Sequence, residues 1–196
     1  MKKTIEKQRG LRFDEINSLV QEIGTDSEEE WLALPIDERR KRKEKFWDCL
    51  WDWILDGWAA GLLFVGEDKD IPDLTSILNW VYPRGETTSE IFDKDVTDKK
   101  KLQTMIECEA NRCFNAGVIE AGKGTGATKT WETMGDEKVR DSHWWLEGMT
   151  IPLEEEFVTY DGDSALAPGG FEFPQNNVNC RCWLSLHKGK NGESLL

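Results

Sequence analysis

The chain has 196 residues, of which 38% are hydrophobic and 32% charged, a balance that fits a folded protein and excludes collagen-like or wholly disordered classes. Its formal net charge of −13 makes it poorly suited to gripping duplex DNA, because phosphate contacts need clustered Lys and Arg. No apolar stretch approaches the roughly 20 residues of a membrane span. No apolar segment of a secretion signal follows Met1, so we expect the five cysteines to be reduced.

Apolar residues recur at helical spacing through the first part of the chain. The pattern predicts helices over residues 13–23, 38–64, 71–81 and 98–116. Gly24 and Gly117 are expected to stop the first and the last of them. Between the first two, Ser27 and Glu30 have the spacing of a capping box. The basic run over residues 39–43 is flanked by acidic residues and is expected to be a solvated helix face.

The long helix expected over residues 38–64 carries an apolar stripe and many tryptophans. Its apolar positions step by four residues: Phe46, Leu50, Ile54, Trp58 and Leu62. Gly57 and Gly61 lie four apart on the same helix, which lets another backbone approach closely because neither has a Cβ atom. Tryptophan favours cores and protein interfaces, so a partner is expected to dock at Trp47, Trp51 and Trp58.

The texture of the sequence changes after the Gly-rich turn over residues 122–126. Short segments with Trp, Val, Ile and Phe then alternate with Gly, Pro, Asp and Asn, which is typical of short antiparallel strands and loops. The chain is therefore expected to be α+β, with an N-terminal helical region followed by a small C-terminal antiparallel β-rich domain. The expected divisions are a helical arm over residues 1–95, a domain over 96–186 and a polar tail over 187–196.

Two motifs suggest chemistry. The stretch from Gly117 to Lys123 matches most of a phosphate-binding loop, but Gly124 replaces the hydroxyl residue that holds magnesium, so we interpret its glycines as a helix stop and a turn. His143, Cys180 and Cys182 form a candidate metal site, because a Cys-x-Cys pair and a His can ligate zinc, with Asp136 or Asp141 as a fourth ligand. Buried thiols beside a hydrogen-bonded His, without any cofactor, are the alternative.

The second half also resembles a known family. Four ordered blocks carry the resemblance. The first covers residues 109–117 and includes Glu109 and Arg112, and the second covers 129–143 and includes Trp131, Asp136, Arg140 and His143. The third covers 146–157 and includes Gly148, and the fourth is Asn179-Cys180-Arg181-Cys182. Over residues 96–186 this set is similar to the phage Mu F-like family of minor head, or head morphogenesis, proteins. The ten core residues that the resemblance assigns to the motif are Glu109, Arg112, Trp131, Asp136, Arg140, His143, Gly148, Asn179, Cys180 and Cys182.

The resemblance implies a structural role rather than an enzyme. Members are minor capsid proteins of tailed bacteriophages, made in the host cytoplasm and built in few copies into the procapsid. They are associated with the portal vertex, and some with DNA packaging or ejection. The implied partners are portal, capsid or scaffold proteins inside the virion, with no membrane. The charge of the chain makes direct DNA binding the less favoured alternative. The alternative is a hydrolase or toxin-like enzyme that uses His143 with Cys180 or Cys182.

Physical chemistry adds three expectations about the motif. Arg140 is a candidate for a bidentate pair with the carboxylate of Glu109 or Asp136. Trp131 and Phe157 are expected to anchor the small β core. Cys180 and Cys182, on a strand, should face the same side by the two-residue period, toward His143.

Overall fold

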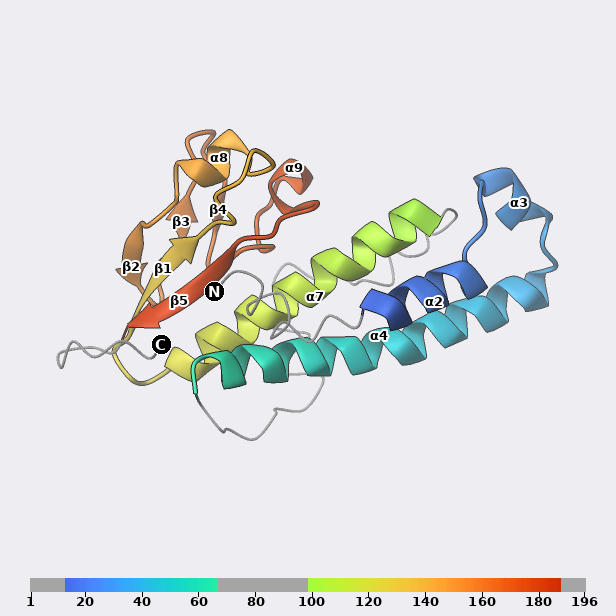
Figure 1. Cartoon of the computed structure of the whole chain (residues 1–196), viewed down its shortest axis with the longest axis horizontal. Helices are drawn as coiled ribbons and strands as arrows, with labels where there is room; N and C mark the ends of the chain where they lie inside the picture. Colours follow the sequence, from blue (N-terminus) through green and yellow to red (C-terminus); the bar gives the residue numbers. More distant parts are fainter. Residues whose placement is uncertain (1–12, 67–98, 188–196) are drawn as a thin grey trace.

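The computed structural model of the chain describes residues 13–66 and 99–187 (Figure 1). The helix expected over residues 71–81 lies outside these ranges, and the side chains of Trp47 and Trp51 are outside the described set as well. The described helices are α2 (Phe13–Ile23), α3 (Glu28–Ala33), α4 (Ile36–Phe64), α7 (Lys99–Gly122), α8 (Asp141–Trp144) and α9 (Pro174–Asn177). The described strands are β1 (Thr128–Glu132), β2 (Thr150–Pro152), β3 (Phe157–Val158), β4 (Ser164–Ala165) and β5 (Trp183–His187).

The first helices form as the sequence predicts. Helix α2 ends where Gly24 donates its backbone N–H to the carbonyl of Val20. Ser27 caps α3 by accepting a hydrogen bond from the N–H of Glu30, at 3.2 Å. The second half of the expected box differs, because the Glu30 carboxylate accepts from the N–H of Asp26 instead of Ser27.

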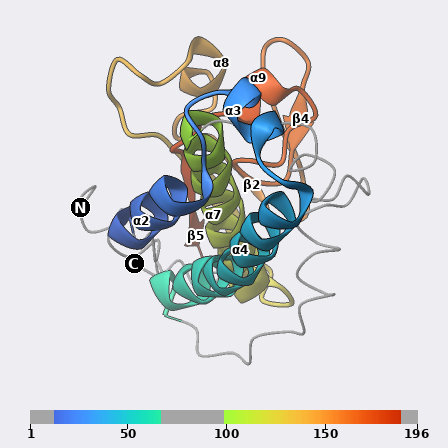
Figure 2. The same cartoon turned by 90° about the vertical axis from the view of Figure 1, so that its right-hand side faces the viewer.

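Helices α4 and α7 pack along much of their length, and α2 lies beside them (Figure 2). All five residues of the predicted α4 stripe are buried, which confirms the periodicity. The two backbones cross very closely at Gly61 and Gly117. A Cβ atom on Gly61 would lie 2.1 Å from the Phe114 carbonyl oxygen, and one on Gly117 would lie 2.2 Å from the Trp58 carbonyl oxygen. The close approach predicted from the α4 glycines is therefore present.

Two expectations on these helices were wrong. Helix α7 runs on to Gly122 rather than stopping before Gly117, because Gly117 serves the crossing with α4 and not a helix end. Trp58, expected to dock a partner, is only 1% exposed and belongs to the buried hydrophobic core. Trp58 is thus a core residue of the helix pair in this conformation.

Up to residue 187, where the described part ends, the C-terminal half forms two small antiparallel sheets. Strand β1 lies between β2 and β5, with Trp131 opposite Leu184, and β3 pairs with β4. Helix α7 packs on β5 as well as on α4, so a single buried core runs from α2 into the sheet. Helices followed by antiparallel strands confirm the α+β class (Figure 1). His187, expected in a polar tail, is instead the last residue of β5, where it pairs with Thr128.

The core of the sheet is aromatic. Trp131 and Phe157 are fully buried with ring centroids 5.1 Å apart, which confirms them as anchors.

Within the described ranges, none of the helices is both long enough and apolar enough to cross a membrane.

Candidate functional site

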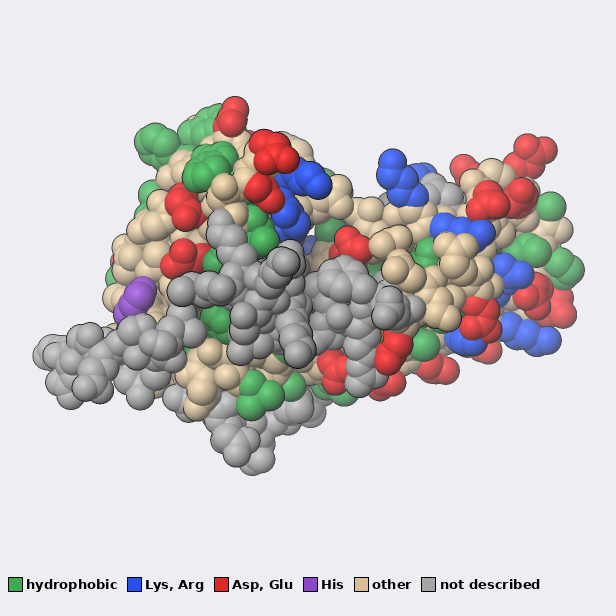
Figure 3. All heavy atoms as spheres, in the orientation of Figure 1, with side chains coloured by type: hydrophobic (Ala, Val, Ile, Leu, Met, Phe, Trp, Pro, Cys, Tyr) green, Lys and Arg blue, Asp and Glu red, His purple; other side chains and the backbone are tan. Residues whose placement is uncertain are grey.

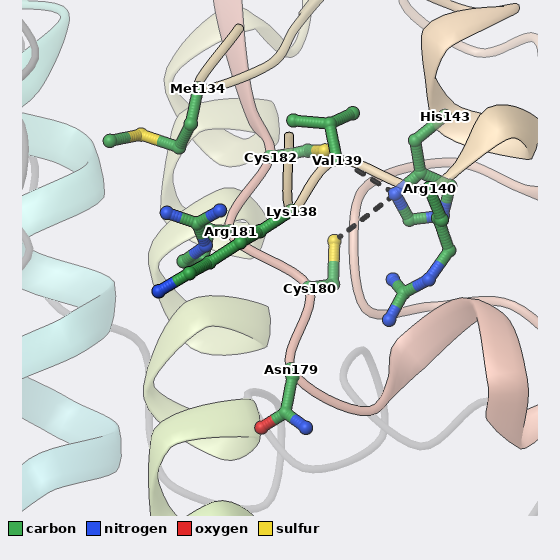
Figure 4. A pocket seen from close by; sticks show the side chains of 9 residues that line it. All are labelled: Met134, Lys138, Val139, Arg140, His143, Asn179, Cys180, Arg181 and Cys182. Atoms are coloured by element: carbon green, nitrogen blue, oxygen red, sulfur yellow. Dashed lines mark hydrogen bonds between the residues drawn. The ribbon is translucent and has the colours of Figure 1, made fainter. Parts of the chain in front are cut away.

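His143, Cys180 and Cys182 come together in the C-terminal half (Figure 4). The Nδ1 atom of His143 lies 3.7 Å from Sγ of Cys180 and 3.3 Å from Sγ of Cys182, and all three ligand atoms lie within 4.8 Å of one another. All three side chains are buried. The convergence predicted from the sequence is therefore confirmed.

The cysteines belong to the extended segment between α9 and β5, not to the strand itself. Asn179, just before them, has a φ of 56°, the one positive value among the described residues other than glycine. Asparagine is among the few residues that tolerate this left-handed backbone, and it turns the chain out of α9. Two residues apart on extended chain, Cys180 and Cys182 then point to the same side.

Asn115 on α7 holds the segment that carries the two cysteines. The fully buried amide of Asn115 donates to the Cys182 carbonyl at 3.3 Å, and its oxygen accepts from the backbone N–H of Leu184 at 3.0 Å. Its amide nitrogen also donates to the carbonyl of Asn111, at 3.0 Å. Asn115 therefore fixes the position of the Cys182 backbone relative to α7.

His143 lies on α8 and directs its ring toward the two sulfur atoms. Its ring stacks on Phe171 with centroids 5.5 Å apart and meets Trp131 edge-on at 5.3 Å. Within the described part of the chain, its Nε2 atom is buried without a hydrogen-bond partner. The ring is thus held by aromatic packing, with Nδ1 presented to the two thiols.

The surroundings favour ionisation of one thiol. The pKa of Cys180 lies well below its ordinary value, chiefly because the Cys182 thiol hydrogen-bonds to it, and His143 lowers it further against the opposing effect of burial. Cys108 behaves oppositely: burial raises its pKa to about 11. Burial also raises the pKa of Cys113. Cys180 is therefore distinct from the ordinary buried thiols of this chain.

A small pocket opens beside the cluster. Besides His143, Cys180 and Cys182 it is lined by Met134, Lys138, Val139, Arg140, Asn179 and Arg181 (Figure 4). Its rim is held by Arg181, which makes a two-pronged contact with the Asp136 carboxylate at 2.7 and 2.9 Å. The hydrogen bonds from Arg181 hold the pKa of Asp136 below its ordinary value.

The expected role of Arg140 was wrong. Its guanidinium donates to the backbone carbonyls of Asn176 and Val178, at the end of α9, rather than to a carboxylate. Asp136 is already paired with Arg181, and the neighbour of Glu109 is Arg112, one turn along α7 at 3.6 Å. Arg140 therefore ties α9 to α8 through backbone oxygens.

Comparison with known proteins decides the family. Residues 78–185 match the model of the family described as phage Mu protein F like protein. The chain belongs to the phage Mu F-like family. It is also similar to the minor head protein GP7 of Bacillus phage SPP1, with 32% identity over 88 residues, 43% of this chain and 29% of that protein. The chain thus spans less than a third of that relative's length, and no solved structure matches it.

The phage Mu F-like motif residues fall into three groups. Trp131, His143, Cys180 and Cys182 form the cluster and its aromatic wall. Arg140 and Asn179 line the pocket, and Asp136 pairs with Arg181, which lines it too. Glu109, Arg112 and Gly148 lie elsewhere: Arg112 donates to the Gly169 carbonyl at 2.7 Å, and Gly148, with φ 72°, turns the chain after α8. The last group supports the fold around the site rather than lining it.

Sequence reasoning missed several residues that build the site. Asn115, Phe171 and Arg181 contact it directly, and Asp163 organises the loop behind it. The buried Asp163 carboxylate accepts from the N–H groups of Glu172 and Phe173 and from the Asn176 amide. The position of Arg181 between the two cysteines was the only available signal, because the other partners are distant in sequence.

Proposed function

We propose that this protein is a structural minor component of a tailed-phage head. It would be made in the host cytoplasm and built in few copies into the procapsid, where it contacts portal, capsid or scaffold proteins at the portal vertex. The observation that carries the proposal is the family match over residues 78–185, more than half of the chain. The name of the SPP1 relative, a minor head protein, supports the same role.

The cluster fits a structural role better than a hydrolytic one. His143 is 1% exposed and is enclosed by Trp131 and Phe171. A general base must come within hydrogen-bond reach of the substrate proton that it abstracts. The imidazole is buried beside a small pocket, which disfavours the approach of a substrate, so the hydrolase or toxin-like alternative gains no support from the site.

Exposed aromatic side chains favour a contact surface on the C-terminal half. Trp144 and Trp145, at the end of α8, are 44% and 61% exposed. Figure 3 shows hydrophobic side chains gathered over α8. Exposed tryptophans of this kind are the usual anchors of protein interfaces. We therefore propose that other proteins of the phage head contact this chain at Trp144 and Trp145 rather than at Trp58.

The charges favour a protein partner over DNA. Acidic and basic side chains alternate over the α3 end of the molecule in Figure 3. Within the basic run, Arg42 pairs with Glu38 at 2.9 Å. A surface of mixed sign on a chain of net charge −13 is a weak match for a phosphate backbone.

The test is to count the protein in purified phage particles. Procapsids from infected cells would be analysed by quantitative mass spectrometry, with and without deletion of the portal gene. We expect a few copies per particle and their loss when the portal is absent. If the protein stays free in the lysate and is absent from particles, the proposal is wrong and the hydrolase or toxin-like role becomes the better explanation.

A pair of variants tests the surface. Trp145→Ala should lower the copy number per particle without lowering the melting temperature, because the side chain is exposed. Leu63→Ala, at a 68% exposed position on α4, is the matched control and should be incorporated normally. Equal incorporation of both variants would move the contact surface away from α8.

A further inference from the structure

The donor set of the buried cluster is that of a transition-metal site. Two thiols and an imidazole are the ligands that Zn²⁺ prefers in proteins, at Zn–S distances of about 2.3 Å and Zn–N distances of about 2.0 Å. In a tetrahedron with these bond lengths, sulfur and nitrogen lie about 3.5 Å apart. The observed separations of 3.7 and 3.3 Å lie on either side of this value.

Ordinary packing explains this arrangement poorly. A neutral imidazole accepts through one ring nitrogen and donates through the other. Nδ1 of His143 faces the two thiols, and Nε2 is buried without a hydrogen-bond partner in the described part of the chain, whichever nitrogen carries the proton. That orientation leaves one ring nitrogen without a hydrogen bond and points the other at two sulfur atoms. A strong bond at Nδ1, such as a metal bond, compensates for this loss.

We propose that this protein binds one Zn²⁺ ion through Nδ1 of His143 and the sulfur atoms of Cys180 and Cys182, with water from the adjacent pocket as the fourth ligand. Each cysteine ligates as a thiolate, so binding to the neutral cluster releases two thiol protons to solvent and forms two Zn–S bonds and one Zn–N bond. Two thiolates and a neutral imidazole around Zn²⁺ give a first shell with no net charge, which suits a buried site.

The pocket supplies room for the fourth ligand. It lies against all three ligand residues and is lined by Met134, Arg140 and Asn179 among others (Figure 4). Neither aspartate that the sequence suggested is part of the ligand group: Asp136 is paired with Arg181, and Asp141 is exposed. Zinc sites with three protein ligands keep the fourth position open to water, whereas closed structural sites have four protein ligands.

The ion would act as a clip between two otherwise separate segments. His143 belongs to α8, which lies between β1 and β2 in the chain. The two cysteines come just before β5, which pairs with β1 on the edge opposite β2. Fixing these segments together also fixes the Trp131 and Phe171 rings between them. The proposal does not depend on the role in phage heads, because it concerns the purified chain alone.

The first experiment measures metal in the full chain. Protein produced in zinc-supplemented medium and purified without chelators would be analysed by elemental mass spectrometry, and Co²⁺ would then be titrated into metal-free protein. We expect about one Zn²⁺ per chain, together with the thiolate-to-cobalt charge-transfer and d–d absorption of a four-coordinate site. Zinc at a hundredfold excess over its dissociation constant should raise the melting temperature by about 5–10 °C.

Matched variants assign the ligands. Cys182→Ser and His143→Gln should lose stoichiometric Zn²⁺ and the cobalt spectrum. Cys49→Ser removes a cysteine from α4 instead and should retain both. If the ligand variants fail to fold, the wild-type measurements still decide the matter, because metal content and the cobalt spectrum need no variant.

Three results would overturn the proposal. They are wild-type protein without metal and without a response to Co²⁺, ligand variants that bind as well as Cys49→Ser, and a native mass lower by the two hydrogens of a Cys180–Cys182 disulfide. The last result would identify the pair as a redox bond in place of a metal site.

Discussion

The closest contact between helices offers the sharpest test of the fold. Replacing Gly61 by alanine would place its Cβ 2.1 Å from the carbonyl oxygen of Phe114 and 2.9 Å from the backbone nitrogen of Val118. Cβ atoms essentially never approach closer than 3.0 Å, so α4 and α7 must separate by about 0.9 Å. Both atoms belong to the backbone of α7, and no side-chain rotation can relieve the clash.

The magnitude follows from two opposing effects. Alanine gains about 1 kcal/mol over glycine inside a helix. Overpacking a well-packed core costs typically 1–3 kcal/mol, and here the separation also loosens contacts along the whole helix pair. We expect Gly61→Ala to destabilise the protein by about 2 kcal/mol, which corresponds to a fall in melting temperature of about 4–8 °C.

Gly57→Ala, one turn earlier on the same helix, is the control. Its Cβ would meet the Ala110 carbonyl oxygen at 3.2 Å and the Cys113 Cβ at 3.3 Å, which is tight but open to small shifts. We expect its stability to stay within about 1 kcal/mol of the wild type. Denaturant unfolding followed by circular dichroism measures both. A Gly61→Ala variant as stable as Gly57→Ala would refute the close crossing.

Three further predictions concern buried polar groups. Burial lowers the pKa of Lys129 to about 8 from 10.5, so above pH 8 the unfolded chain keeps a proton that the folded chain has lost. The free energy of unfolding of the wild type should therefore rise by about 1.3 kcal/mol relative to Lys129→Met between pH 7 and pH 9. An equal difference between the two proteins at both pH values, measured by denaturant unfolding, would contradict this. Asn115→Asp should lose about 3 kcal/mol at neutral pH in urea unfolding, because a carboxylate would face the Asn111 and Cys182 carbonyls; an unchanged midpoint would show that these contacts are absent. Asp163→Asn should lose about 1–3 kcal/mol in the same assay, since its oxygens accept from several N–H groups, and a stability equal to wild type would exclude this network.

The helices show what sequence periodicity can and cannot predict. The stripe from Phe46 to Leu62 was predictable, because one face of α4 is apolar and its two glycines mark a close approach. The end of α7 was not. A glycine after an apolar run is locally a good helix stop, and only the partner helix reveals that Gly117 is needed for packing.

The site shows the same division. The meeting of His143 with Cys180 and Cys182 was predictable from the two-residue spacing of the cysteines and the order of the family blocks. The partner of Asp136 was not, because Arg140 and Arg181 are equivalent by sequence alone. The chain path decides: Arg140 ends beside the carbonyls of α9, which leaves Arg181 facing the carboxylate.

The two halves of the molecule are coupled through a single turn of α7. Gly117 contacts α4 on one side of this turn, and Asn115 holds the Cys182 carbonyl and the Leu184 N–H on the other. A shift of α7 away from α4 therefore moves the support of the second cysteine. Metal–ligand distances in a bound site stay within about 0.2 Å of their standard values, whereas a Cβ on Gly61 would force the two helices about 0.9 Å apart. The close helix crossing thus helps to hold the His–Cys–Cys cluster in a geometry suited to a metal.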